Sequence, residues 1–249
     1  MAVETEEAYG GHGIFGLTML KGIIFDLDGV IVDSHPAHKQ AWRELLASLG
    51  REVSAVQLQF VMEGHKRDEI LRHFLGDLSG EEVRRLGQLK DDLYRRVAHE
   101  VKLIPGVAEL ISAAKLAGLG LAVATSAGRR RAEETLRRFE LMESFRVVMT
   151  GDEVQAGKPD PAVFQRAADG LELGAEHLLV CEDAVAGVQA AKRAGMRCLG
   201  IGADGRRELL QNAGADWIVE DFLRMGVGEI QTLFLDQKSR SVSVCSLLI

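Results

Sequence analysis

The chain has 249 residues, a mass of 27.2 kDa and 47% apolar residues, which suffices for one large domain or one domain with an insertion. Its 37 acidic and 30 basic side chains give a net charge of −7, which disfavours nonspecific nucleic-acid binding. No apolar run approaches the ~18 residues of a membrane span. We therefore expect a globular protein with neither a nucleic-acid nor a membrane partner.

Cysteine usage and the N-terminal sequence indicate the compartment. Cys181, Cys198 and Cys245 are odd in number and form no Cys-x-x-Cys pair, which argues against a disulfide framework or a zinc site. Glutamates at positions 4, 6 and 7 stand where a secretory signal carries basic residues. These features predict a cytoplasmic protein, and we expect it to be a monomer.

The first predicted element is a buried strand at Lys21–Phe25, which ends in a turn at Asp26-Leu-Asp-Gly29. Residues 36–102 then show helical periodicity and no convincing strand. A helix around residues 41–49 stops at Gly50, and a capping box at Ser79–Glu82 opens a long helix through about Val101.

From residue 106 onward, predicted helices and strands alternate. The expected strands are 119–124, 145–149, 177–181, 196–201 and 216–219, and helices are expected at 107–114, at 129–140 and from Asp160-Pro161 onward. Such alternation predicts a parallel sheet covered on both faces, with ligands bound at the carboxyl ends of its strands. The polar residues that fall at those ends are Asp26, Asp28, Thr125, Ser126, Glu182 and Asp183.

The fold class predicted from this pattern is α/β, a Rossmann-like parallel sheet core with an inserted α-helical cap. The core comprises residues 20–35 and 103–235, and the cap comprises 36–102. Residues 1–19 are Gly-rich and aperiodic and 236–249 are rich in Ser and Val, so both are interpreted as tails. The insertion follows the first strand, which places the cap above the edge that carries the polar residues.

Asp26 and Asp28 lie two residues apart at a strand end, so their side chains point to one side. Two such carboxylates repel each other, and the pKa of one rises unless a cation lies between them. The functional interpretation is a metal site in which one carboxylate attacks and the other handles protons. Taken alone, an Asp-x-Asp-Gly string also suits a simple turn cap.

Other residues at the same edge favour the functional interpretation. Thr125 or Ser126 can donate hydrogen bonds to a phosphate, and Lys158 supplies a positive charge. Glu182 and Asp183 add two carboxylates, and carboxylates with waters and a substrate phosphate are the ligands that Mg²⁺ favours. Mg²⁺ and a lysine would remove the repulsion between an attacking aspartate and a phosphate. The set predicts phosphoryl transfer through an aspartyl phosphate.

The strings Phe25–Val30, Ala124–Ser126, Lys158-Pro159 and Glu182-Asp183 resemble the four motifs of the haloacid dehalogenase superfamily, over about residues 20–235. The resemblance implies that Asp26 is the nucleophile and Asp28 the general acid/base. It implies that Ser126 or Thr125, with Lys158, holds the phosphate. It also implies Mg²⁺ ligation by Asp26, the backbone carbonyl of Asp28 and Asp183, with Glu182 binding the ion directly or supporting its ligands.

Within that superfamily the chain looks most like β-phosphoglucomutases and related sugar-phosphate phosphatases. His38, Arg67 and Lys90 match the cap residues that the mutases use on the sugar phosphate. The chain departs from the mutases at Ala127-Gly-Arg129, where they have a small residue and Lys-Asn, and Arg129 is either a substitute phosphate ligand or a solvated charge. The resemblance implies a phosphatase that hydrolyses a small sugar phosphate, with a β-phosphoglucomutase-type mutase as the alternative.

Two more distant functions also match parts of the sequence. Gly200–Gly205 spells G-x-G-x-x-G between a predicted strand and a helix, as in a dinucleotide-binding dehydrogenase, but only about one strand follows it. A phosphoacceptor signalling domain also gathers aspartates, a hydroxyl and a lysine at strand ends. Such a domain has no need of Asp28 or of a helical lid, whereas a lid serves catalysis by excluding water.

Overall fold

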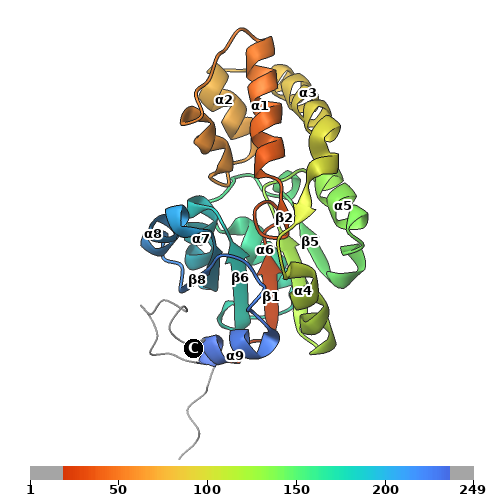
Figure 1. Cartoon of the computed structure of the whole chain (residues 1–249), viewed down its shortest axis with the longest axis vertical. Helices are drawn as coiled ribbons and strands as arrows, with labels where there is room; N and C mark the ends of the chain where they lie inside the picture. The colour runs from red at the N-terminus through yellow and green to blue at the C-terminus, as the bar shows by residue number, and fades with distance from the viewer. Residues whose placement is uncertain (1–18, 236–249) are drawn as a thin grey trace, which may run out of the picture.

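The computed structural model describes residues 19–235, which form a parallel sheet core with a helical part above it (Figure 1). The six strands of the sheet lie in the order β5-β4-β1-β6-β7-β8, and every pairing is parallel. Their bounds are β1 Gly22–Phe25, β4 Gly120–Ala124, β5 Val147–Met149, β6 Leu178–Glu182, β7 Arg197–Ile201 and β8 Trp217–Val219. The predicted α/β fold class is confirmed.

Alternate residues of β1 pack into two different apolar clusters, one on each face of the sheet. Ile23 and Phe25 belong to one cluster and Ile24 to the other, as the two-residue period of a strand requires. On the first face lie α4 Val107–Leu116, α5 Arg129–Arg138 and α9 Val227–Leu235; on the second lie α6 Ala162–Leu171, α7 Val185–Arg193 and α8 Asp204–Ala213. Burial on both faces explains why the strands are apolar runs rather than alternating ones.

The helical part stands over the end of the sheet where β1, β4 and β6 finish (Figure 1). It consists of α1 His35–Ser48, the 3₁₀ helix η1 Gln57–Met62, α2 Arg67–Leu75, α3 Gly80–Val97 and the 3₁₀ helix η2 Ala98–Glu100. Its two connections to the core pair with each other as a short antiparallel sheet, β2 Val32–Asp33 with β3 Lys102–Leu103. These two strands carry the chain from the core into the helical part and back.

Several predicted element ends shift by a few residues. The long helix of the cap ends at Val97 rather than near Val101, because η2 turns the chain into β3. Proline 161 is the N-cap of α6 rather than its first residue, and Asp160 Oδ1 accepts from the Ala162 amide at 2.9 Å. The capping box is present: the Glu82 amide donates to Ser79 Oγ, and the Ser79 amide donates to the Glu82 carboxylate.

None of the described helices is long and apolar enough to cross a membrane. The predicted tails lie outside the described residues, apart from Met19.

Candidate active site

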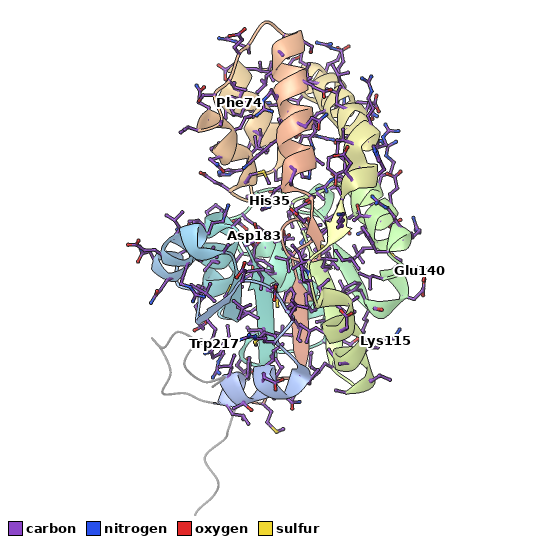
Figure 2. All side chains as sticks on the ribbon, viewed as in Figure 1. His35, Phe74, Lys115, Glu140, Asp183 and Trp217 are labelled. Atoms are coloured by element: carbon purple, nitrogen blue, oxygen red, sulfur yellow. The ribbon has the colours of Figure 1, made fainter. Side chains whose placement is uncertain are left out.

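A cavity of about 480 Å³ lies between the carboxyl ends of β1, β4 and β6 and the helices of the cap. Figure 2 shows His35 and Asp183 at this level, between the cap helices and the sheet. The predicted site residues that line it are Asp26, Asp28, His38, Arg67, Lys90, Thr125, Ser126, Lys158 and Asp183. Parallel topology explains why these residues lie together, because β1 lies between β4 and β6 in the sheet and all three strands end at the same edge.

Asp26 follows β1 directly and lies against Lys158. The ammonium of Lys158 donates to Asp26 Oδ1 at 2.8 Å and to Glu182 Oε1 at 2.5 Å. Burial raises the pKa of Asp26 to about 7; Lys158 opposes this rise, while Glu182 and Asp28 add to it. Burial also raises the pKa of Glu182, although Lys158 opposes it. One buried lysine thus serves two buried carboxylates.

The carboxylates of Asp26, Glu182 and Asp183 form a buried cluster in which one oxygen from each lies within 4.8 Å of the others. Both oxygens of Glu182 are engaged, because Oε2 accepts from the Ala184 amide at 2.8 Å. Asp183 Oδ2 is buried without a hydrogen-bond donor, although His35 Nε2 lies 3.1 Å away. Three carboxylates with one lysine and an unsatisfied oxygen fit a hard divalent cation such as Mg²⁺.

Gly29 shapes the space beside this cluster. Its φ of +78° lies in the left-handed region, and a Cβ there would collide with the Asp183 carboxylate and His35. The glycine of the Asp-x-Asp-Gly string is therefore required by both the backbone turn and the close approach of Asp183.

Asp28 lies at the side of the cavity that faces the cap, and four donor atoms converge on it. Its Oδ1 accepts from Ser34 Oγ at 2.6 Å, is 3.3 Å from His38 Nε2 and accepts from Arg131 at 2.8 Å. Its Oδ2 accepts a second bond from Arg131 at 2.5 Å. Burial by itself would raise the pKa of Asp28, but Arg131 and His38 outweigh burial and hold it well below its ordinary value.

Behind Asp28, the side chains of His38 and Lys90 form a buried pair between α1 and α3. Lys90 Nζ lies 2.8 Å from His38 Nδ1, and the Tyr94 ring stacks on the imidazole. Burial and the nearby lysine lower the pKa of His38 to about 3, so the ring is neutral. With Nδ1 accepting from Lys90, Nε2 carries the proton and faces Asp28. Lys90 is buried, although its charged neighbours in the sequence are typical of a solvated helix surface.

The two hydroxyl residues after β4 have different surroundings. Thr125 is buried, and its Oγ1 accepts from the Ala127 amide at 3.1 Å, which stabilises the turn. Ser126 Oγ donates to the Gly64 carbonyl of the cap at 2.7 Å. Lys66 Nζ crosses the same gap to the Val154 carbonyl at 3.0 Å, so the cap lies closed on the core.

The structure does not bring Arg129, the candidate phosphate ligand, to the cavity. Its guanidinium lies 2.5 Å from Glu153 Oε2, and its amide donates to Asp152. Arg131, two residues further along α5, lines the cavity and binds Asp28. Residues i and i+2 of a helix point to different sides, so only one of them can face the site. Here the helical register, rather than sequence position after the motif, selects the arginine.

Arg67 lines the cavity from α2 and pairs with Asp91 at 2.7 Å. Three contributors were not identified from the sequence, namely His35, Tyr94 and Arg131. Three arginines in the first turn of α5 were the available signal for Arg131, because the helix dipole disfavours cations there unless an anion is near. His35 and Tyr94 carried no comparable signal.

The string Gly200–Gly205 spans the end of β7 and the start of α8, and β8 is the one strand described after it. Gly200 is the sheet partner of Glu182, but none of the residues of the string lines the cavity. The geometry gives no support to a dinucleotide site there.

Comparisons with known proteins agree with this geometry. A family model described as haloacid dehalogenase-like hydrolase matches residues 23–201. The phosphorylated carbohydrates phosphatase of Thermotoga maritima is 33% identical over 189 residues, covering 71% of this chain and 82% of that protein. The β-phosphoglucomutase structure from Clostridium difficile superposes with a TM-score of 0.78 at 25% identity, covering 87% and 97% of the two chains. The structure of a CbbY mutant from Rhodobacter sphaeroides with xylulose-(1,5)bisphosphate gives 0.76 at 29% identity, covering 86% and 100%.

Proposed function

Because the chain is an enzyme that belongs to the haloacid dehalogenase-like hydrolase family, we propose that it hydrolyses a small sugar phosphate through an aspartyl phosphate on Asp26. The observation that carries the proposal is the position of Asp26, which lies at the bottom of the cavity against Lys158, with Asp28 two residues further on. The sugar-phosphate substrate class is supported by the phosphatase of Thermotoga maritima and by the CbbY complex.

In the first half-reaction, a carboxylate oxygen of Asp26 attacks phosphorus, and the bond between phosphorus and the sugar oxygen breaks. Lys158 neutralises charge on Asp26 and on the phosphoryl oxygens, and Ser126 can turn its hydroxyl from Gly64 to the phosphate. Asp28 in its protonated form gives its proton to the leaving sugar oxygen.

In the second half-reaction, Asp28 as a carboxylate takes a proton from water, and the water oxygen attacks the phosphorus of the aspartyl phosphate. The bond from phosphorus to Asp26 breaks, which regenerates the carboxylate and releases inorganic phosphate. The closed cap, through Ser126 and Lys66, limits which water and which sugar reach Asp28.

Asp26, Asp183 and the Asp28 backbone carbonyl would hold Mg²⁺ directly at the carboxylate cluster. Glu182 holds Lys158 and the Ala184 amide, which suits a supporting role. When bound, the ion would offset the repulsion between the Asp26 carboxylate and the phosphate and polarise the phosphoryl oxygens.

A β-phosphoglucomutase-type reaction is the second candidate. The buried contacts of Lys90 with His38 and of His38 with Asp28 favour the mutase reaction, because His38 and Lys90 match the cap residues that the mutases use on the sugar phosphate. In that reaction Asp28 would activate a sugar hydroxyl instead of water.

The test is phosphate release in the presence of Mg²⁺ from a panel of sugar phosphates that includes β-glucose 1-phosphate and xylulose 1,5-bisphosphate. A parallel assay couples β-glucose 1-phosphate turnover to glucose 6-phosphate dehydrogenase, with a trace of β-glucose 1,6-bisphosphate. We expect free phosphate, lost on chelation with EDTA. Glucose 6-phosphate without free phosphate would establish the mutase instead. Turnover that persists in EDTA would contradict the metal assignment.

A further inference from the structure

Arg131 is a cation of the core, with its side chain 15% exposed, and it binds the proposed acid/base directly. It lies in the first turn of α5, and its two terminal nitrogens reach the two oxygens of Asp28 at 2.8 and 2.5 Å. Its guanidinium also lies over the Tyr94 ring of the cap, 5.4 Å from the ring centre. A bidentate pair of this kind is among the strongest hydrogen-bonded contacts in proteins.

This pair conflicts with the work expected of Asp28. Ser34, His38 and Arg131 all approach Oδ1, and Arg131 also occupies Oδ2. The N–H groups of Arg131 stand where a leaving sugar oxygen or an attacking water must approach the carboxylate. Catalysis therefore requires Arg131 to withdraw from at least one oxygen of Asp28.

A withdrawn Arg131 needs another anion. Within residues 19–235, Asp28 is the one carboxylate that forms an ion pair with it. Of the neighbouring acidic groups, Asp91 is bound to Arg67 at 2.7 Å, whereas Glu134 is half exposed and lies 3.9 Å from Arg130. Lys90, the other buried cation on this side of the cavity, contacts His38 and so adds positive charge. A largely buried guanidinium without a partner is costly, and a substrate anion in the cavity can supply that partner.

We propose that Arg131 gates Asp28, and that a substrate whose non-reacting end carries a second anionic group opens this gate by taking over the guanidinium. The inference rests on the proposed function and narrows its substrate class. Phosphate esters with a neutral far end leave the pair intact and react slowly, and the closed enzyme is protected from idle hydrolysis.

The test compares fructose 1,6-bisphosphate with fructose 6-phosphate in the wild type, Arg131→Met and Arg131→Lys. Arg137→Met is the matched control, because Arg137 is an exposed arginine of the same helix, pairs with Glu133 on that helix and does not line the cavity. The readout is the ratio of kcat/KM for the two substrates. This ratio is independent of how much of each preparation is folded, so a destabilised variant still reports.

Loss of a charge-assisted bidentate contact should lower kcat/KM for the bisphosphate about 10- to 100-fold in Arg131→Met. The same variant should hydrolyse the monophosphate several-fold faster than wild type, because Asp28 is no longer covered. Arg131→Lys keeps the charge without the planar fork, so its kcat/KM ratio should lie between those of wild type and Arg131→Met. Arg137→Met should match wild type.

An unchanged ratio in Arg131→Met, with both substrates slowed equally or neither affected, would overturn the gate. Failure of the proposed function is recognised separately, by phosphate release that survives in Asp26→Asn. Inactivity of Asp26→Asn combined with an unchanged ratio in Arg131→Met would overturn the gate alone.

Discussion

The floor of the cavity and its cap-facing side hold their carboxylates in different ways. At the floor, Lys158 from the core binds Asp26 and Glu182, and all three lie on segments at the carboxyl edge of the sheet. On the cap-facing side, Asp28 is bound by Ser34, by His38 of the cap and by Arg131 of α5. The floor is complete within the core, whereas the surroundings of Asp28 depend on where the cap lies.

This difference separates two tasks. Asp26, Lys158 and Glu182 all belong to the core, so the floor keeps its charges whatever sugar is attached. The contacts of Asp28 change when the cap moves or when Arg131 finds another anion. We infer that the core determines the chemistry and that the cap-facing side determines which substrate receives it.

The largest effect is expected from a substitution at the floor of the cavity. Asp26→Asn removes the nucleophile while leaving an isosteric side chain beside Lys158, so phosphate release should fall about 10⁴-fold or more. Asp33→Asn is the control, since Asp33 is exposed at the end of β2. Steady-state phosphate release measures both, and circular dichroism checks folding. Turnover within tenfold of wild type in Asp26→Asn would exclude Asp26 as the nucleophile.

The next largest effect is expected from a substitution on the cap-facing side that leaves the floor unchanged. Asp28→Ala removes the proton donor and acceptor, and turnover should fall about 10²- to 10⁴-fold. The carboxylates of Asp26 and Asp183 and the backbone carbonyl of residue 28 remain. Mg²⁺ should therefore still raise the melting temperature of the variant as it does for wild type. Loss of this Mg²⁺ effect would show that the Asp28 side chain belongs to the metal site.

A smaller effect concerns Lys90 and pH. Burial, with a contribution from Arg131, lowers the pKa of Lys90 from 10.5 to about 7, while Asp91 and Asp28 oppose the shift. Between these two values the unfolded chain binds more protons at Lys90 than the folded chain. The free energy of unfolding therefore rises as pH increases from about 7 toward 10.5.

Lys90→Met removes this titration. Urea unfolding at pH 7 and pH 9 should show wild type gaining stability relative to Lys90→Met on the order of 1–2 kcal/mol. Below about pH 7 the two proteins should respond alike, because Lys90 is then protonated in both states. Parallel pH dependences between pH 7 and 9 would contradict the lowered pKa.

The smallest effect separates the stability of the cap from the selection of substrate. Ser79→Ala removes the capping-box hydroxyl at the start of α3, which should cost about 1 kcal/mol of stability. Ser79 lies outside the cavity lining, so the kcat/KM ratio between sugar phosphates should not change. Thermal unfolding and the same kinetic ratio test both statements. A changed ratio would mean that fraying of α3 reaches Lys90.

Local sequence determined much of this protein. Apolar runs that end in polar residues predicted β1, β4 and β6 and placed Asp26, Asp28 and Glu182 at one edge, because strands alternating with helices form a parallel sheet. Helical periodicity predicted an inserted helical part, and Ser79 with Glu82 predicted where α3 begins. These features depend on neighbours a few residues apart, which a sequence displays directly.

Tertiary structure alone decided how the cap-facing side is built. Which of Arg129, Arg130 and Arg131 faces Asp28 depends on where the first turn of α5 begins and on its rotation against the sheet. The burial of Lys90 beside His38 depends on how α3 packs on α1, across 52 positions of sequence. Contacts of this range follow from packing and charge compensation in the folded molecule, which no local pattern specifies.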